Sequence, residues 1–169
     1  LILAVMLIAS SLIALRMVGK KWWALFSRTL ISITVGGGLM LVLVTQAVLE
    51  LSPWYSPRFM IPLAGMIFAN CLNSISLAVE RLMAELDRGI VFDEAKKIAF
   101  RASLIPIVNS LFAVGLVSLP GMMTGQILSG VSPLIAVRYQ IMVMTMVFGA
   151  SGISTATFLI LVRNKFAYI

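Results

Sequence analysis

Long apolar stretches alternate with short polar ones along this chain. Thr29 to Ala47 contains no charged residue, whereas Arg81 to Arg101 contains nine of the 19 in the chain. A helix of about 20 apolar residues crosses the hydrocarbon layer of a bilayer, which is roughly 30 Å thick. The pattern therefore predicts five membrane spans joined by polar connections: Leu1 to Leu15 (incomplete), Ala24 to Leu49, Met60 to Val79, Ala102 to about Leu119, and about Pro133 to Val162.

The spans are expected to be helices, because a backbone in lipid must satisfy its hydrogen bonds internally and barrel strands are much shorter. The predicted fold class is all-α, a polytopic transmembrane helix bundle with residues 81–101 as its central cytosolic loop. The first run is too short to span and does not begin with Met, so residues 1–169 are interpreted as one N-terminally truncated membrane domain. A signal peptide fits less well, because no basic residue precedes this run.

Composition supports the membrane interpretation and excludes several function classes. The chain is 61% hydrophobic and 11% charged, against roughly 25% charged residues in soluble domains. It has one cysteine, Cys71, and no His, so it can form neither an internal disulfide nor a zinc site built from Cys and His. The net charge of +7 does not indicate a nucleic-acid partner, because the basic residues lie at the ends of apolar segments.

The distribution of Lys and Arg predicts the orientation in the membrane. Eleven of the 13 basic residues fall in connections on one side of the predicted spans, and that side is expected to be the cytosol. They are Arg16, Lys20, Lys21, Arg28, Arg81, Arg88, Lys96, Lys97, Arg101, Arg163 and Lys165. The C-terminus is therefore predicted to be cytosolic, and residues 50–58 and 121–132 to lie on the outer side.

The central charged stretch also has a helical pattern of apolar residues. Leu82 and Leu86 precede Gly89, and apolar residues recur after it from Phe92 to Ala99 at three- and four-residue spacings. This periodicity predicts two short amphipathic helices that flank Gly89. Such a segment serves either as a solvated tether or as a surface for docking a partner.

Polar side chains inside the spans are the candidates for a substrate path. Asn70 and Asn73 share a helical face of the third span, and Asn109 lies in the fourth. Since the two spans flank the same loop, their helices are expected to be neighbours. The alternative role is interhelical hydrogen bonding, worth about 0.6–2 kcal/mol per contact.

The segment around Pro120 and Gly121 predicts a broken or kinked helix, because proline lacks the donor that a helix interior needs. Interrupted membrane helices expose carbonyls that coordinate ions, and thioethers bind soft transition metals. Met122, Met123 and Gln126 are therefore added to the candidate path, with both methionines as candidate metal ligands. A packing kink with Met as gap filler is the alternative.

Three stretches resemble a known family: SLPGMMTGQILSGVSPLIAVRYQIMV (Ser118 to Val143), IPLAGMIFAN (Ile61 to Asn70) and RASLIPIVNS (Arg101 to Ser110). They closely resemble the FetB-type permeases, also known as uncharacterised protein family 0014. Members of that family are membrane subunits of ABC transporters that pair with a separate ATPase. The bacterial type is linked to iron export, and plant relatives are linked to aluminium tolerance.

The resemblance implies a permease of the plasma (bacterial inner) membrane that acts as a dimer with two ABC ATPase subunits. ATP and Mg would be bound by the ATPase, and this chain would hold no cofactor; it has no Walker A pattern. The central loop would couple the two proteins through Glu85, Asp87, Arg88, Asp93, Glu94, Lys96 and Lys97. Family members usually have further N-terminal spans and a longer loop, whereas Ile90 here leads directly into Val91.

Two other functions fit the residues. One is a channel-like or scaffold membrane protein that is not coupled to ATP, and the other is an ABC permease for a small polar solute. A membrane-embedded enzyme is disfavoured, because the chain has no His and every acid lies outside the span interiors.

Overall fold

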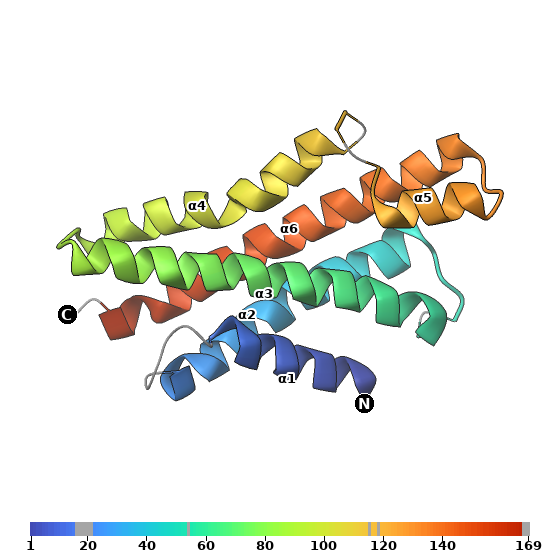
Figure 1. The fold of residues 1–169 in the computed structure, drawn as a ribbon. Helices are drawn as coiled ribbons and strands as arrows, with labels where there is room; N and C mark the ends of the chain where they lie inside the picture. Colours follow the sequence, from blue (N-terminus) through green and yellow to red (C-terminus); the bar gives the residue numbers. More distant parts are fainter. Residues whose placement is uncertain (16–21, 54, 115, 118, 167–169) are drawn as a thin grey trace.

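The computed structural model describes residues 1–15, 22–53, 55–114, 116–117 and 119–166. The described residues form a helical bundle without strands (Figure 1). In chain order the elements are α1 (Ile2–Ala14), α2 (Trp22–Val42), the π-helix η2 (Leu43–Val48), α3 (Pro57–Asp87), α4 (Phe92–Ala113), α5 (Gly121–Leu128) and α6 (Pro133–Phe166). The predicted all-α fold class is confirmed.

Among the described residues, three segments are long and apolar enough to cross a membrane: Leu25–Val48, Pro57–Asp87 and Pro133–Arg163. They contain or closely match the second, third and fifth predicted spans. The first predicted span, Leu1 to Leu15, corresponds to the shorter apolar helix α1, which has 13 residues.

The fourth predicted span, Ala102 to about Leu119, is wrong as a single helix. α4 begins ten residues earlier, at Phe92, and ends at Ala113, where Val114 adopts an extended backbone. The apolar sequence continues past this end, so hydropathy gave no sign of it. The predicted break near Pro120 is present, since α5 begins only at Gly121 with Pro120 as its N-cap residue.

The central charged stretch is a helical hairpin. α3 continues through it to Asp87, and α4 begins five residues later at Phe92. The helices that flank Gly89 are therefore confirmed, but they are the ends of long helices and not two short ones. Gly89 has φ of +80°, a conformation that glycine adopts without steric cost. Asp93 and Glu94 occupy the first turn of α4, where acidic side chains interact favourably with the helix dipole.

The two long helices α3 and α6 occupy the middle of the bundle. α3 packs against α1, α2, α4 and α6, and α6 packs against α2, α3, α4 and α5. Figure 1 shows the α3–α4 turn, the start of α2 and the end of α6 at one end of the bundle. The described part of the basic set therefore gathers at that end, while Arg16, Lys20 and Lys21 lie outside the described residues.

Two glycines allow α2 to approach its neighbours closely. A Cβ atom on Gly36 would lie only 2.9 Å from Cα of Ser154 on α6, and one on Gly37 would lie 2.9 Å from Cγ2 of Ile67 on α3. Small residues at such contacts are typical of membrane helices, where packing and not the hydrophobic effect drives association. Gly38 has no atom within 4 Å of the equivalent position, so it makes no such contact.

Candidate functional site

A buried polar contact joins the two central helices next to Gly36. The hydroxyl of Ser154 on α6 donates a hydrogen bond to Sγ of Cys71 on α3, at 3.2 Å. Both side chains are fully buried. Cys71 is therefore a small buried residue whose thiol accepts a hydrogen bond.

More hydroxyl groups lie buried along α6. Ser151 and Thr155 are completely inaccessible, and neither hydroxyl has a hydrogen-bond partner among the described residues. Buried polar groups normally find partners, so two orphan hydroxyls one turn apart mark an unusually polar part of the bundle interior. Sequence reasoning missed them, although the run of small residues from Gly149 to Thr157 (GASGISTAT) is a recognisable sign of close packing in membranes.

The three predicted path asparagines lie on α3 and α4, two helices that pack together. Asn70 is half-buried, and its amide donates to the carbonyl of Met66 at 2.8 Å, within its own helix. Asn73 and Asn109 are exposed on the surface of the chain. No hydrogen bond links the three to one another in the described part of the chain. The side chains of Asn73 and Asn109 are accessible, whereas the amide nitrogen of Asn70 is already bonded within α3.

The other three path residues lie on α5, which packs chiefly against α6. Met123 is buried, Met122 is exposed, and Gln126 is half-buried with an Oε1 atom that lacks a hydrogen-bond partner. No described hydrogen bond joins α5 to the asparagines. The structure therefore presents the six predicted residues as two separate groups, one on α3 and α4 and one on α5.

Charged residues at the hairpin form a small ion-pair network. Glu85 is 2% exposed, and its Oε1 accepts from Arg81 one turn earlier and from Arg88 at 3.3 Å. At the start of α4, the carboxylate of Asp93 lies 3.8 Å from the guanidinium of Arg163 on α6 and 3.7 Å from Nζ of Lys96. The pairs of Glu85 are local to the end of α3, and the pair with Lys96 is local to the start of α4. The pair of Asp93 with Arg163 connects α4 to the end of α6.

The predicted coupling residues differ in their accessibility. Asp87, Arg88, Asp93, Glu94 and Lys97 are exposed, Lys96 is half-buried, and Glu85 is buried. A partner protein can reach the exposed residues directly. It cannot reach Glu85 in this conformation, so that carboxylate acts inside the hairpin.

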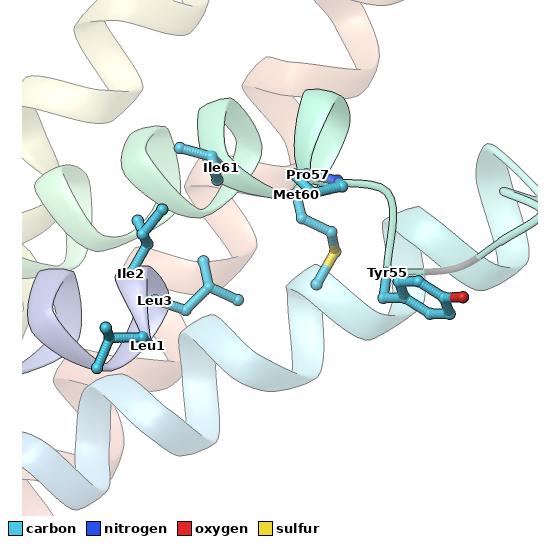
Figure 2. Close-up of a pocket in the computed structure, with 7 residues that line it drawn as sticks. All are labelled: Leu1, Ile2, Leu3, Tyr55, Pro57, Met60 and Ile61. Atoms are coloured by element: carbon cyan, nitrogen blue, oxygen red, sulfur yellow. The ribbon is translucent and has the colours of Figure 1, made fainter.

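A pocket of about 350 Å³ lies between the N-terminal end of α1 and the start of α3. Figure 2 shows apolar side chains around it, with the Tyr55 hydroxyl pointing away from the other six residues: Leu1, Ile2, Leu3, Pro57, Met60 and Ile61. Such a lining offers no ligand for a hard cation. Within the described residues, no group of three or more His, Cys, Asp or Glu side chains gathers to hold a metal ion.

Comparison with known proteins gives consistent matches. The family model described as "Uncharacterised protein family (UPF0014)" matches residues 1–91 and 90–167, two stretches that meet at the α3–α4 turn. The UPF0014 membrane protein slr1647 of Synechocystis is 36% identical over 92% of this chain and 66% of its own length. The probable iron export permease protein FetB of Escherichia coli is 38% identical over 83% of this chain and 59% of its own length.

A plant protein is similar as well. Protein ALUMINUM SENSITIVE 3 of Arabidopsis thaliana is 35% identical over 61% of this chain and 43% of its own length. The chain thus spans less than two thirds of the curated relatives that it matches. No solved structure matches it. The family model covers nearly the whole chain, and three segments of the described part are suited to crossing a membrane. This integral membrane protein therefore belongs to the UPF0014 family.

Proposed function

We propose that the chain is the membrane permease subunit of an ABC transporter that exports a metal ion, with iron as the expected substrate. The observation that carries the proposal is its 38% identity to a protein described as a probable iron export permease. Two features of the bundle support a permease: its long apolar helices and the charged α3–α4 hairpin at one end. ATP and Mg belong to a separate ATPase subunit, and two permease chains are expected to pair with two ATPases.

The α3–α4 hairpin is the proposed site of coupling. Its exposed charges, above all Asp87, Arg88 and Glu94, are accessible to a partner. If the basic end faces the cytosol, the hairpin is on the side of the membrane where an ATPase finds ATP. The C-terminus then lies on the same side.

Motion at the hairpin can reach the middle of the membrane through α3 itself. The helix has 31 residues, so at 1.5 Å per residue it is about 46 Å long. No loop interrupts it between Asp87 and Asn70. Because Asp93 is paired with Arg163, a force on the hairpin also acts on α6. A tilt of α3 and α6 would alter the packing around Ser154 and Cys71.

The metal path is proposed to run past polar and thioether groups in two places. Asn70, Asn73 and Asn109 offer amide oxygens on α3 and α4, and Met122, Met123 and Gln126 offer soft and amide donors on α5. A small number of fixed ligands is suitable for a transport path, because the substrate must be released as well as bound. The orphan Oε1 of Gln126 is the group in this set that most needs a partner.

The experiment that tests this function uses the full-length protein and its candidate ATPase, co-expressed and reconstituted together in liposomes. We expect the two to co-purify, and ferrous iron to raise the rate of ATP hydrolysis. Metal uptake into vesicles with outward-facing ATPases would show the direction of transport. A matched ATPase variant without its catalytic carboxylate should bind the permease but neither hydrolyse ATP nor drive transport.

Two results would overturn the proposal in different ways. If the permease and ATPase do not associate, the chain acts without ABC coupling, as a channel or scaffold. If they associate but hydrolysis responds to a small polar solute and not to metals, coupling is retained and iron is the wrong substrate.

A further inference from the structure

A second hollow lies on the outside of the bundle, between α4 and α6. It has a volume of about 210 Å³ and is lined by Lys96, Lys97 and Phe100 of α4 and by Ala156, Leu159 and Ile160 of α6. The four residues other than lysine are apolar. This groove therefore combines a hydrocarbon-like wall with two ammonium groups.

The charged and apolar parts of the groove lie at different depths. On α4 the two lysines come one turn before Phe100 and thus nearer to the hairpin. On α6, Leu159 and Ile160 come just before Arg163, where the membrane-spanning segment ends. The lysines therefore lie at the water side of the groove, and the apolar wall continues toward the membrane interior.

Positive charge prevails at this water side. The charged groups there are Lys96, Lys97 and Arg163, with Asp93 and Glu94 in the first turn of α4, three basic and two acidic. Asp93 lies 3.7 Å from Lys96 and 3.8 Å from Arg163, and its side chain is 59% exposed. Glu94 is exposed as well. Two solvated carboxylates beside three cations leave one net positive charge for an anionic ligand.

We propose that the groove binds one anionic phospholipid. Its phosphate contacts Lys96 and Lys97, and one acyl chain lies along Phe100 and Ile160, with the buried Leu159 at the base of the groove. Basic pockets between membrane helices at the cytoplasmic surface are suited to anionic headgroups. Ile160 is 66% exposed within a segment that is long and apolar enough to cross the membrane, so a lipid chain fits this position better than a water-soluble partner does.

This inference rests on the membrane placement of α6 and not on the proposed transport activity. It does divide the predicted coupling residues into two sets. Asp87, Arg88 and Glu94 remain for the ATPase, whereas Lys96 and Lys97 face the lipid. A bound phospholipid would brace α4 against α6 beside the hairpin.

The test measures which lipids the purified full-length protein retains. The protein is exchanged into nanodiscs with equal amounts of phosphatidylglycerol and phosphatidylcholine, then released and analysed by native mass spectrometry. Because a lysine near an anionic surface is worth about 1 kcal/mol, or roughly fivefold in binding, we expect a preference for phosphatidylglycerol of roughly tenfold or more. The double variant Lys96→Gln/Lys97→Gln should lose most of this preference.

Two further variants separate charge from shape. Arg58→Gln removes an exposed basic residue at the start of α3, away from the groove, and should leave the preference unchanged. Ala156→Phe keeps every charge but fills the groove, and should reduce retention of the bound lipid.

Several outcomes would overturn the proposal. One is equal retention of both lipids by the parent protein, and another is an unchanged preference in the double lysine variant. A third is protection of Lys96 and Lys97 from amine-reactive labelling by the ATPase subunit and not by phosphatidylglycerol, which would assign both lysines to the protein interface. Lipid retention needs neither ATP nor metal, so a failure of the transport proposal leaves this result interpretable.

Discussion

The contact between α2 and α6 and the surface of α4 and α5 are both strongly apolar in sequence, yet they are packed very differently. Along the first, Ile33, Ala150 and Ser154 are completely buried, and Gly36 allows the backbones to approach closely. Along the second, Phe112 is 72% exposed and Leu128 83% exposed. Hydropathy shows that both regions avoid water, and the small residues mark the region that is covered by another helix of the bundle.

This difference assigns separate roles to the two regions. The α2–α6 contact uses small residues and buried hydroxyls, which favour a fixed arrangement of helices. α5 is only eight residues long and packs chiefly on α6. Relative movement is therefore expected on the side of α4 and α5, with the α2–α6 contact as the support.

The largest predicted effect concerns the turn before α4 and the turn after α5, which should face opposite sides of the membrane. A cysteine at Asp87, beside the hairpin turn, should react with an impermeant maleimide only from the cytosolic side. A cysteine at Ser132, before α6, should react only from the outside. Both positions are exposed, and the buried Cys71 of the parent protein should not react. Labelling of both positions from the same side would refute this topology.

A strong effect on stability is predicted for the α2–α6 contact. Gly36→Ala places a methyl group 2.5 Å from the backbone nitrogen of Ser154, closer than packed atoms approach. Overpacking typically costs about 1–3 kcal/mol, so the thermal midpoint of the detergent-solubilised protein should fall.

Gly38→Ala is the matched control on the same helix. No atom lies within 4 Å of its Cβ position, and alanine is favoured over glycine in helices by about 1 kcal/mol. This variant should be at least as stable as the parent. Equal destabilisation by both substitutions would show that α2 does not pack on α6 through Gly36.

Much of this fold could be predicted from sequence because lipid imposes a simple rule on length and polarity. The segments Ala24 to Leu49 and Pro133 to Val162 match the structure to within a few residues. α3 extends beyond its predicted end at Val79, since a helix satisfies its own backbone in water as well as in lipid. The end of α4 at Ala113 was not predictable, because the following residues are just as apolar.

The candidate site was less predictable, since it depends on which helices are neighbours. The pattern placed Asn70 and Asn109 on adjacent helices, and α3 and α4 do pack together. It did not indicate that Ser154 meets Cys71 across 83 residues of chain. The sequence pattern also assigned Glu85 to the coupling residues together with its charged neighbours, because a linear sequence does not show that this carboxylate is buried.

A smaller effect is predicted for the ion pairs of Glu85 at the end of α3. Glu85→Gln removes the charge that binds Arg81 and Arg88, but both arginines remain partly exposed and can be solvated. Because solvent screens the exposed arginines, the cost should be about 0.5–1.5 kcal/mol, as for a typical intramolecular hydrogen bond, and below that of a fully buried pair. The hairpin should open more often, seen as faster amide hydrogen exchange at residues 85–92.

Asp87→Asn serves as the control for that substitution. Asp87 is exposed and has no ion pair in the described structure, so hydrogen exchange in the hairpin should remain unchanged. If both variants behave alike, burial of Glu85 contributes nothing to the stability of the hairpin.

The smallest effect on stability, and the sharpest test of function, is predicted for the methionines of α5. Replacing Met122 and Met123 with Leu conserves volume and hydrophobicity, so each change should cost less than about 1.5 kcal/mol. Met123 is buried and Met122 is exposed, and the cost should therefore come mainly from Met123. If the two thioethers contact the metal, iron-stimulated ATP hydrolysis by the reconstituted complex should fall while the thermal midpoint changes little. Met144, a core-packed methionine on α6, provides the matched control, since Met144→Leu should leave metal stimulation intact. Full stimulation in the double variant would remove the methionines from the path and leave Gln126, with its unpaired amide oxygen, as the candidate ligand on α5.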